Sequence, residues 1–186
     1  EGARRRAAWA ALAAALFYIG MGQVQSARAE RLGAAELARD GFAAAELRAV
    51  PTPLNIFVWR VLARSEDGAL RIGYVSTLAP GPIGFIAIDP TDDPLVERAL
   101  ASPKGRLFAW FAMGMVSTTV ERSSDGARVV IHDQRYGLMT RPGETMFRAE
   151  ADFDRSGRLR AMRHPLHYQR FDVAAEFREL WRLMLG

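Results

Sequence analysis

With 186 residues, 49% of them apolar and 25% charged, the sequence is long enough for one globular domain with an appendage, and this composition excludes a disordered chain. The formal net charge of +4 rests on arginines, with Lys104 as the single lysine; because the arginines are scattered, the charge argues against nucleic-acid binding. The absence of cysteine excludes disulfides, thiolate metal sites and cysteine nucleophiles.

The first predicted element is an N-terminal helix that carries no charge from Ala7 to Ala27. Arginines occupy residues 4–6, and the uncharged stretch has the length of about 20 residues that a membrane span requires. We predict the last transmembrane helix of a longer protein, because the sequence begins at Glu1 without a methionine. A signal-like segment and an amphipathic or buried helix of a soluble protein are the alternatives.

The helix is predicted to continue past the membrane boundary. Charges of both signs return between Arg28 and Arg39, and Gly41 supplies a C-terminal stop. Residues 1–41 are therefore predicted to form a membrane-proximal helical segment. Arginines lie on both sides of the uncharged stretch, so the positive-inside signal nearly cancels and leaves the side of the membrane open.

From Val50 onward the pattern predicts β-strands separated by turns at regular spacing. Pro51 and Pro53 hold the chain extended and forbid a helix, so they mark the beginning of the β domain. Strands are predicted over 55–64, 69–77, 84–88, 106–121, 127–136 and 145–153, with a last short strand after Gly157. Turns are predicted at 65–68, 124–126, 141–144 and 154–157.

Two further helices are predicted in this part of the chain. A short one is capped by Thr91 or Asp92 and ended by Pro103. The C-terminal helix is capped by Asp172 and is expected to cover the sheet. Its apolar face consists of Val173, Phe177, Leu180, Trp181 and Met184. Residues 42–186 are thus predicted to be an extramembrane α+β domain, an antiparallel meander of about six or seven strands with a packed C-terminal helix.

No strong catalytic motif occurs in the sequence: nucleophile elbow, phosphate loop, zinc-protease helix and dinucleotide fingerprint are all missing. His164 and His167 lie three residues apart around a proline, with Asp133 and Asp172 as further possible ligands. A metal needs three or four convergent ligands, so we favour a polar loop and predict no metal site in this sequence.

The richest polar cluster is the run His132-Asp133-Gln134-Arg135-Tyr136. Strand alternation places Asp133 and Arg135 on one face, where they are predicted to pair with each other or with a cross-strand partner such as Arg60. The aromatic run 107–111, like Trp59, is predicted to belong to the core. Ligand binding and catalysis are the alternatives for these residues.

The ligand-binding alternative predicts a concave, largely apolar pocket. Its candidate residues are Trp59, Arg60, Tyr74, Trp110, Phe111, His132, Asp133 and Arg135. The catalytic alternative requires His132, Asp133 and the two later histidines to converge within hydrogen-bonding or coordination distance.

Four motifs follow one another in the order Pro51 to Arg60, Gly73 to Ser76, Phe108 to Gly114 and Asp133 to Gly137. Together they resemble the C-terminal part of the YdjM-like, membrane-bound metal-dependent hydrolases of the bacterial inner membrane. The resemblance covers roughly residues 7–153. The family's presumed metal site belongs to its N-terminal transmembrane part and matches no position here, so a divalent metal would lie in that part.

The resemblance implies an extramembrane, non-catalytic domain that covers a membrane-embedded site, admits a substrate or binds a partner. The expected partners are the membrane and the protein's own N-terminal transmembrane part, with no nucleic acid and no cofactor in this sequence. A small-molecule or lipid-binding module with an aromatic-lined pocket is the alternative function.

Overall fold

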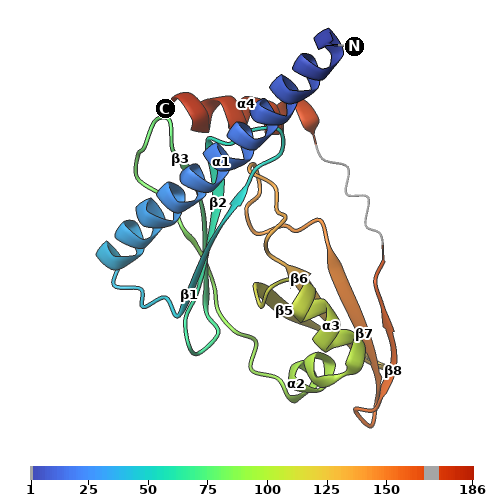
Figure 1. Cartoon of the computed structure of the whole chain (residues 1–186). Helices are drawn as coiled ribbons and strands as arrows, with labels where there is room; N and C mark the ends of the chain where they lie inside the picture. The colour runs from blue at the N-terminus through green and yellow to red at the C-terminus, as the bar shows by residue number, and fades with distance from the viewer. Residues whose placement is uncertain (1, 166–171) are drawn as a thin grey trace.

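The chain forms two antiparallel sheets and four helices over the residues that the computed structural model describes, 2–165 and 172–186 (Figure 1). Sheet A has the strand order β1-β2-β3-β4, and sheet B has the order β5-β6-β7-β8. The elements are α1 (Gly2–Arg39), β1 (Glu46–Pro51), β2 (Val58–Arg64), β3 (Leu70–Ser76), β4 (Ile86–Ile88), α2 (Pro94–Ala101), α3 (Pro103–Phe111), β5 (Val116–Ser123), β6 (Gly126–Asp133), β7 (Arg148–Asp154), β8 (Leu159–Arg163) and α4 (Val173–Leu185). The α+β class is confirmed, whereas the single meander of six or seven strands is wrong.

The C-terminal half of α1 packs on sheet A. Its buried residues are Ala29, Gly33 and Leu37, spaced four apart on one side of the helix. A Cβ atom on Gly33 would lie 2.6 Å from Val61 Cγ1, so only glycine allows this close approach to the sheet. The helix ends at Arg39, and Gly41, the predicted C-terminal stop, follows with a φ of +70°.

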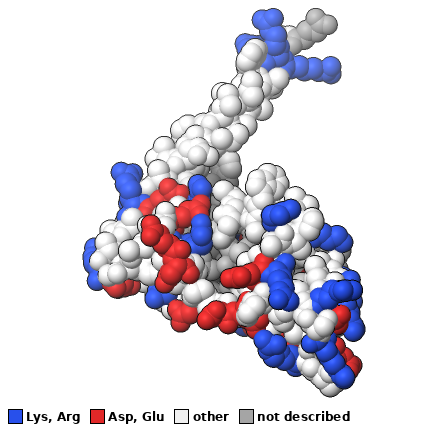
Figure 2. All heavy atoms as spheres, turned by 90° about the horizontal axis from the view of Figure 1, so that it is seen from below, with Lys and Arg blue, Asp and Glu red and all other residues white. Residues whose placement is uncertain are grey.

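The N-terminal half of α1 projects beyond the domain with all of residues 2–20 exposed. Its most apolar 18-residue window has a mean hydropathy of 1.5, and none of that window is buried. Figure 2 shows the uncharged surface of this half between the arginines at its tip and the charged body of the protein. Its length and composition fit a membrane span and equally a signal sequence.

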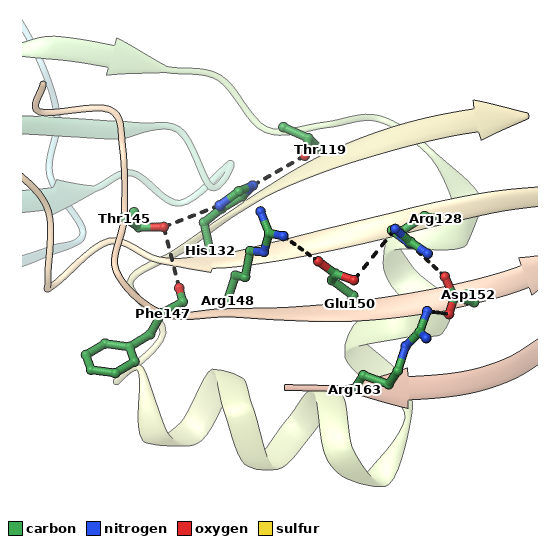
Figure 3. A network of polar contacts seen from close by, with 9 residues as sticks. All are labelled: Thr119, Arg128, His132, Thr145, Phe147, Arg148, Glu150, Asp152 and Arg163. Atoms are coloured by element: carbon green, nitrogen blue, oxygen red, sulfur yellow. Dashed lines mark hydrogen bonds and ion pairs between the residues drawn. The ribbon is translucent and has the colours of Figure 1, made fainter. Parts of the chain in front are cut away.

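Sheet B has one apolar face and one polar face. Helices α2 and α3 cover the apolar face, where Phe108 packs with Val129 and Phe153. The opposite face carries charged side chains in rows across β6, β7 and β8 (Figure 3). On sheet A, the face turned away from α1 packs Leu62 and Ile72 against Met115, which follows α3.

The predicted strand 106–121 is wrong in its first half, because residues 103–111 form α3. Ser102 caps this helix, since its Oγ accepts a hydrogen bond from the Gly105 amide at 3.0 Å, and Pro103 occupies the first turn. The proline that was expected to end one helix therefore begins the next. The chain reverses at Gly114, with a φ of +73°, before β5 begins.

Two smaller differences concern a helix cap and a strand. The cap of α2 is Asp93, whose carboxylate accepts from the Leu95 amide at 2.9 Å, rather than Thr91 or Asp92. Strand β1 was not predicted, and Pro51 is its last residue rather than a boundary before the sheet. As a residue of an edge strand, Pro51 loses no ladder hydrogen bond that a central strand would need.

Helix α4 begins as predicted, with Asp172 Oδ1 accepting from the Ala175 amide at 3.0 Å. Of its predicted sheet-covering face, Leu180 is buried, whereas Phe177 and Trp181 are about half exposed, at 45% and 54%. Val173 is also exposed. The helix contacts β2 and β3 of sheet A as expected, but Val173, Phe177 and Trp181 of the predicted face do not cover the sheet.

Candidate ligand pocket

A pocket of about 660 Å³ lies between the middle of α1, the loop that joins β1 to β2, and the polar cluster after β6. From α1 it is lined by Tyr18, Ile19, Gly22, Gln23 and Ser26. From sheet A and its loop it is lined by Ala49, Pro51, Thr52, Pro53, Leu54, Asn55, Ile56, Trp59, Arg60 and Tyr74, and from the segment after β6 by Arg135, Tyr136, Gly137 and Met146. The pocket therefore joins three separate parts of the chain.

Asn55 organises the loop that forms one wall of the pocket. Its side-chain oxygen accepts hydrogen bonds from the amides of Phe57 at 2.9 Å and Val58 at 2.7 Å, and its side-chain nitrogen donates to Thr52 Oγ1 at 2.6 Å. These bonds satisfy polar groups of the turn within the loop itself, a role that asparagine commonly has in turns. The preceding Leu54 has a φ of 63° and is 88% exposed, which is an unusual position for a leucine.

Arg60 is the central charged residue of the pocket and is only 1% exposed. Its Nε donates to the carbonyl oxygen of Gln134 at 2.7 Å, its Nη1 to Tyr74 Oη at 2.5 Å and its Nη2 to the carbonyl oxygen of Pro142 at 2.8 Å. Burial lowers the pKa of this guanidinium below its usual value. Arg60 thus ties sheet A to the segments that follow β6.

The predicted pairing of Arg60 with Asp133 is wrong. Within the described residues Arg60 makes no salt bridge, and its hydrogen-bond acceptors are neutral oxygens. Asp133 instead pairs with Arg135, with 2.7 Å between Oδ2 and Nη2 and 3.0 Å between Oδ1 and Nε. The predicted pairing of these two neighbours is confirmed. The hydrogen bonds that Arg135 donates to Asp133 raise the pKa of Arg135.

Tyr74 and Arg135 define the polar side of the pocket. The Tyr74 hydroxyl accepts from Arg60 and donates to the carbonyl oxygen of Gly137 at 3.2 Å. Burial raises the pKa of Tyr74, so its hydroxyl stays protonated at neutral pH. The Arg135 guanidinium lies over the rings of Phe111 and Tyr136, at 4.8 and 5.1 Å from their centroids.

Only part of the predicted ligand-binding set is brought together. Trp59, Arg60, Tyr74 and Arg135 line the pocket, with Trp59 also largely buried as predicted. Four others lie outside its lining: Trp110, Phe111, His132 and Asp133. Trp110 is 76% exposed on α3, so its predicted place in a core strand is wrong.

His132 lies on the polar face of sheet B, away from the pocket lining (Figure 3). Its ring nitrogens are 3.3 Å from Thr119 Oγ1 and 3.3 Å from Thr145 Oγ1. Burial, with the nearby positive charge of Arg148, lowers the pKa of His132. A row of ion pairs continues from Arg148 across the sheet, through Glu150, Arg128, Asp152 and Arg163.

The catalytic alternative required His132 to meet the later histidines. His164 stacks on Phe108, with ring centroids 5.6 Å apart, whereas the contacts of His132 are to threonines. His167 lies outside the described residues. Over residues 2–165 and 172–186, no group of three His, Asp or Glu side chains is arranged to hold a metal ion.

Sequence reasoning missed the wall that α1 contributes, because the uncharged helix was assigned to the membrane as a whole. The spacing of Tyr18, Gly22 and Ser26, four residues apart, was the signal for one helix face with a small residue at its centre. The wall formed by residues 51–56 was treated as a boundary, although an apolar Leu54 between two turn-forming residues was unusual.

Comparison with protein-family models, curated protein sequences and solved structures gives no significant match for this chain. Membership of the YdjM-like family therefore stays a prediction from the four motifs.

Proposed function

We propose that this chain is a membrane-anchored, non-catalytic domain that receives an anionic, lipid-derived molecule in the pocket between α1 and sheet A. The observation that carries the proposal is the position of the pocket along α1. On one side of it the helix is uncharged and exposed; on the other, Ala29, Gly33 and Leu37 are buried on the sheet. The lining residues Tyr18 to Ser26 lie where the surroundings of the helix change.

The proposed anchor has the dimensions of a membrane span. The uncharged stretch from Ala7 to Ala27 would be roughly 32 Å long at 1.5 Å per residue. The hydrocarbon core of a bilayer is about 30 Å thick. Arginines at 4–6 and at Arg28 flank the stretch, where their side chains can reach the head groups on either side. The pocket-lining residues 18–26 form the end of this stretch that adjoins the domain, so we expect the pocket to open at the lipid head groups on that side.

The lining of the pocket favours an anionic amphiphile. Arg60 and Arg135 are the charged residues among the lining side chains described, and no carboxylate lines the pocket there. Asp133 neutralises Arg135, which leaves the charge of Arg60 without a carboxylate partner in the described chain. A carboxylate or phosphate head group near Arg60 would supply the missing negative charge. An acyl chain would follow the apolar wall of α1.

The experiment uses the full chain in phosphatidylethanolamine/phosphatidylglycerol vesicles with a photoactivatable fatty acid as probe. The chain should stay with the vesicles after alkaline extraction, and the probe should label residues 18–26 or 49–56. Gly22→Phe should reduce labelling about tenfold, the equivalent of about 1.4 kcal/mol in binding. Gly20→Phe is the matched control: a side chain finds open space at both glycines, but only Gly22 lines the pocket.

Each part of the proposal can fail separately. Release of the chain by alkaline extraction would contradict the membrane anchor. Equal labelling of the Gly20 and Gly22 variants would contradict the pocket as the binding site. Hydrolysis of the bound lipid by this chain would contradict its non-catalytic role. The hydrolase-like, metal-containing partner region and the bacterial inner membrane remain proposals that rest on the resemblance alone.

A further inference from the structure

Two loops and one helix meet at the end of sheet A that adjoins the pocket. Val58 pairs with Ser76 at this end, so the loops 52–57 and 77–85 both leave the sheet here. Helix α4 lies across the same end, where Ser76 Oγ donates to the carbonyl oxygen of Met184 at 3.2 Å (Figure 1). Residues 18–26 of α1 line the pocket together with the loop 51–56, and the remaining N-terminal part of the helix projects away from the body of the protein (Figure 2).

These segments expose large apolar side chains. Leu54 and Leu78 project from the two loops. On α4, the residues Val173, Phe177, Trp181 and Leu185 are spaced four apart and therefore form one stripe along the helix. All of them are about half exposed or more. Water-exposed apolar side chains gathered at one end of a domain mark an interaction surface.

Leu54 is held in place by the loop itself. Its positive φ is a conformation that leucine seldom adopts, and the hydrogen bonds of Asn55 to Thr52, Phe57 and Val58 fix the chain around it. The loop therefore presents an apolar side chain outward at a position where asparagine or glycine would be less strained.

We propose that Leu54, Leu78 and the α4 stripe form a second membrane contact at the boundary between head groups and acyl chains. The inference rests on the proposed function, because α1 supplies the anchor. Leu54 and Tyr18 line the same pocket, so the apolar surface continues from the exposed half of α1 onto the loop. A bilayer fits this surface better than a second protein, since the surface adjoins the helix that enters the membrane.

The charges of α4 fit the same orientation. Arg178 and Arg182 lie on the exposed side of the helix beside the apolar stripe, and Arg182 forms an ion pair with Glu179 of the same helix. A helix with an apolar stripe flanked by arginines is typical of segments that lie in the plane of the membrane interface. The second contact would hold the mouth of the pocket at the depth of the lipid head groups.

The absence of cysteine allows a direct test by single-cysteine labelling of the full chain. An environment-sensitive NBD label is attached to L54C or W181C in phosphatidylethanolamine/phosphatidylglycerol vesicles that contain doxyl-labelled lipids. A14C in the exposed half of α1 reports the anchor, and D125C in the turn at the far end of sheet B reports water. Positions 54 and 181 should show blue-shifted emission and be quenched most by doxyl groups near the head groups.

The four positions separate the two proposals. If position 14 is quenched but positions 54 and 181 are as unquenched as position 125, the second contact is overturned. The anchor is left intact by that result. No quenching at any position overturns the anchor as well, and with it the proposed function. Labels at 54 and 181 that are shielded from both doxyl lipids and aqueous iodide would show that protein covers the surface, which also overturns the second contact.

Discussion

Sheets A and B share a four-stranded antiparallel order, yet they face different surroundings. One face of sheet A is packed under α1, a helix whose other half leaves the domain. One face of sheet B is packed under two short helices that stay within the domain. The free face of sheet B carries a row of ion pairs, whereas one end of sheet A carries exposed leucines and aromatic residues.

This difference assigns separate tasks to the two sheets. Sheet B has the surface of an ordinary water-facing layer, where ion pairs contribute little to stability but keep the face hydrated. Sheet A carries the features that, in the proposed function, connect the domain to the membrane: the long helix, the pocket and the exposed loops. The two sheets are joined at Arg60, whose guanidinium reaches from β2 to the segments after β6.

The largest expected effect breaks this junction. Arg60→Met removes the donors to Tyr74, Gln134 and Pro142, and leaves one buried and two part-buried oxygens without these bonds. We expect a loss of about 3 kcal/mol or more in the free energy of unfolding, measured by denaturant titration in detergent micelles. Arg141→Met is the control, because its ion pair is exposed and should contribute less than about 1 kcal/mol. Equal losses for both would show that Arg60 does not hold the sheets together.

The next effect tests the contact of α1 with sheet A. Gly33→Ala places a Cβ atom 2.6 Å from Val61 Cγ1, in a contact that the fully buried Val61 cannot avoid without shifting. Overpacking of this kind typically costs about 1–3 kcal/mol. Gly20→Ala on the same helix meets no atom within 4 Å and should be neutral or slightly stabilising. Thermal unfolding of the two variants separates packing from helix propensity, and similar midpoints would contradict the packing.

A smaller effect of opposite sign is expected at the loop that bears Leu54. Leu54→Asn suits the positive φ better, so the free energy of unfolding should rise by about 1 kcal/mol in detergent. In vesicles the same variant should weaken the quenching of a label at position 181, because the apolar side chain is gone. If the variant gains stability but the quenching at position 181 does not change, Leu54 makes no membrane contact.

The smallest effect concerns the polar face of sheet B. Burial and Arg148 lower the pKa of His132, so the unfolded chain takes up a proton before the folded chain does. Stability is therefore fully present above the unfolded pKa of about 6.5 and decreases as the pH falls through that value. His132→Gln should show a smaller decrease between about pH 7.5 and about pH 5.5. His164 and His167 are present in both the wild type and the variant. An unchanged decrease in stability would therefore be assigned to those two histidines.

Local chemistry made several elements predictable from the sequence. The hairpin at 65–68 follows from Gly68, which has a φ of +90°, and the turn at 124–126 from Asp125 and Gly126. The stop of α1 at Gly41 and the cap of α4 at Asp172 follow from the same kind of signal. Each depends on a few adjacent residues: a glycine that adopts a positive φ, or a side chain that accepts a hydrogen bond from a nearby backbone amide.

The remaining differences depend on partners far apart in the chain. The run 107–111 has the aromatic residues of a strand, but the cap at Ser102 and packing of Phe108 on sheet B make it a helix. Division into two sheets depends on which strands pair after α2 and α3, which no local pattern encodes. The pocket was predicted at Trp59 and Tyr74 only in part, because its other walls come from α1 and a loop.

Helix α1 runs without a break from Gly2 to Arg39, so its exposed half is joined to sheet A by regular helix rather than by a flexible linker. A flexible linker would let the domain sample many distances from its anchor. The effective concentration of the pocket near the anchor would then be lower. A continuous helix seated on the sheet at Gly33 acts as a rigid strut instead. If the proposed anchor and pocket are correct, the direction of this one helix axis fixes the distance between the pocket mouth and the lipid.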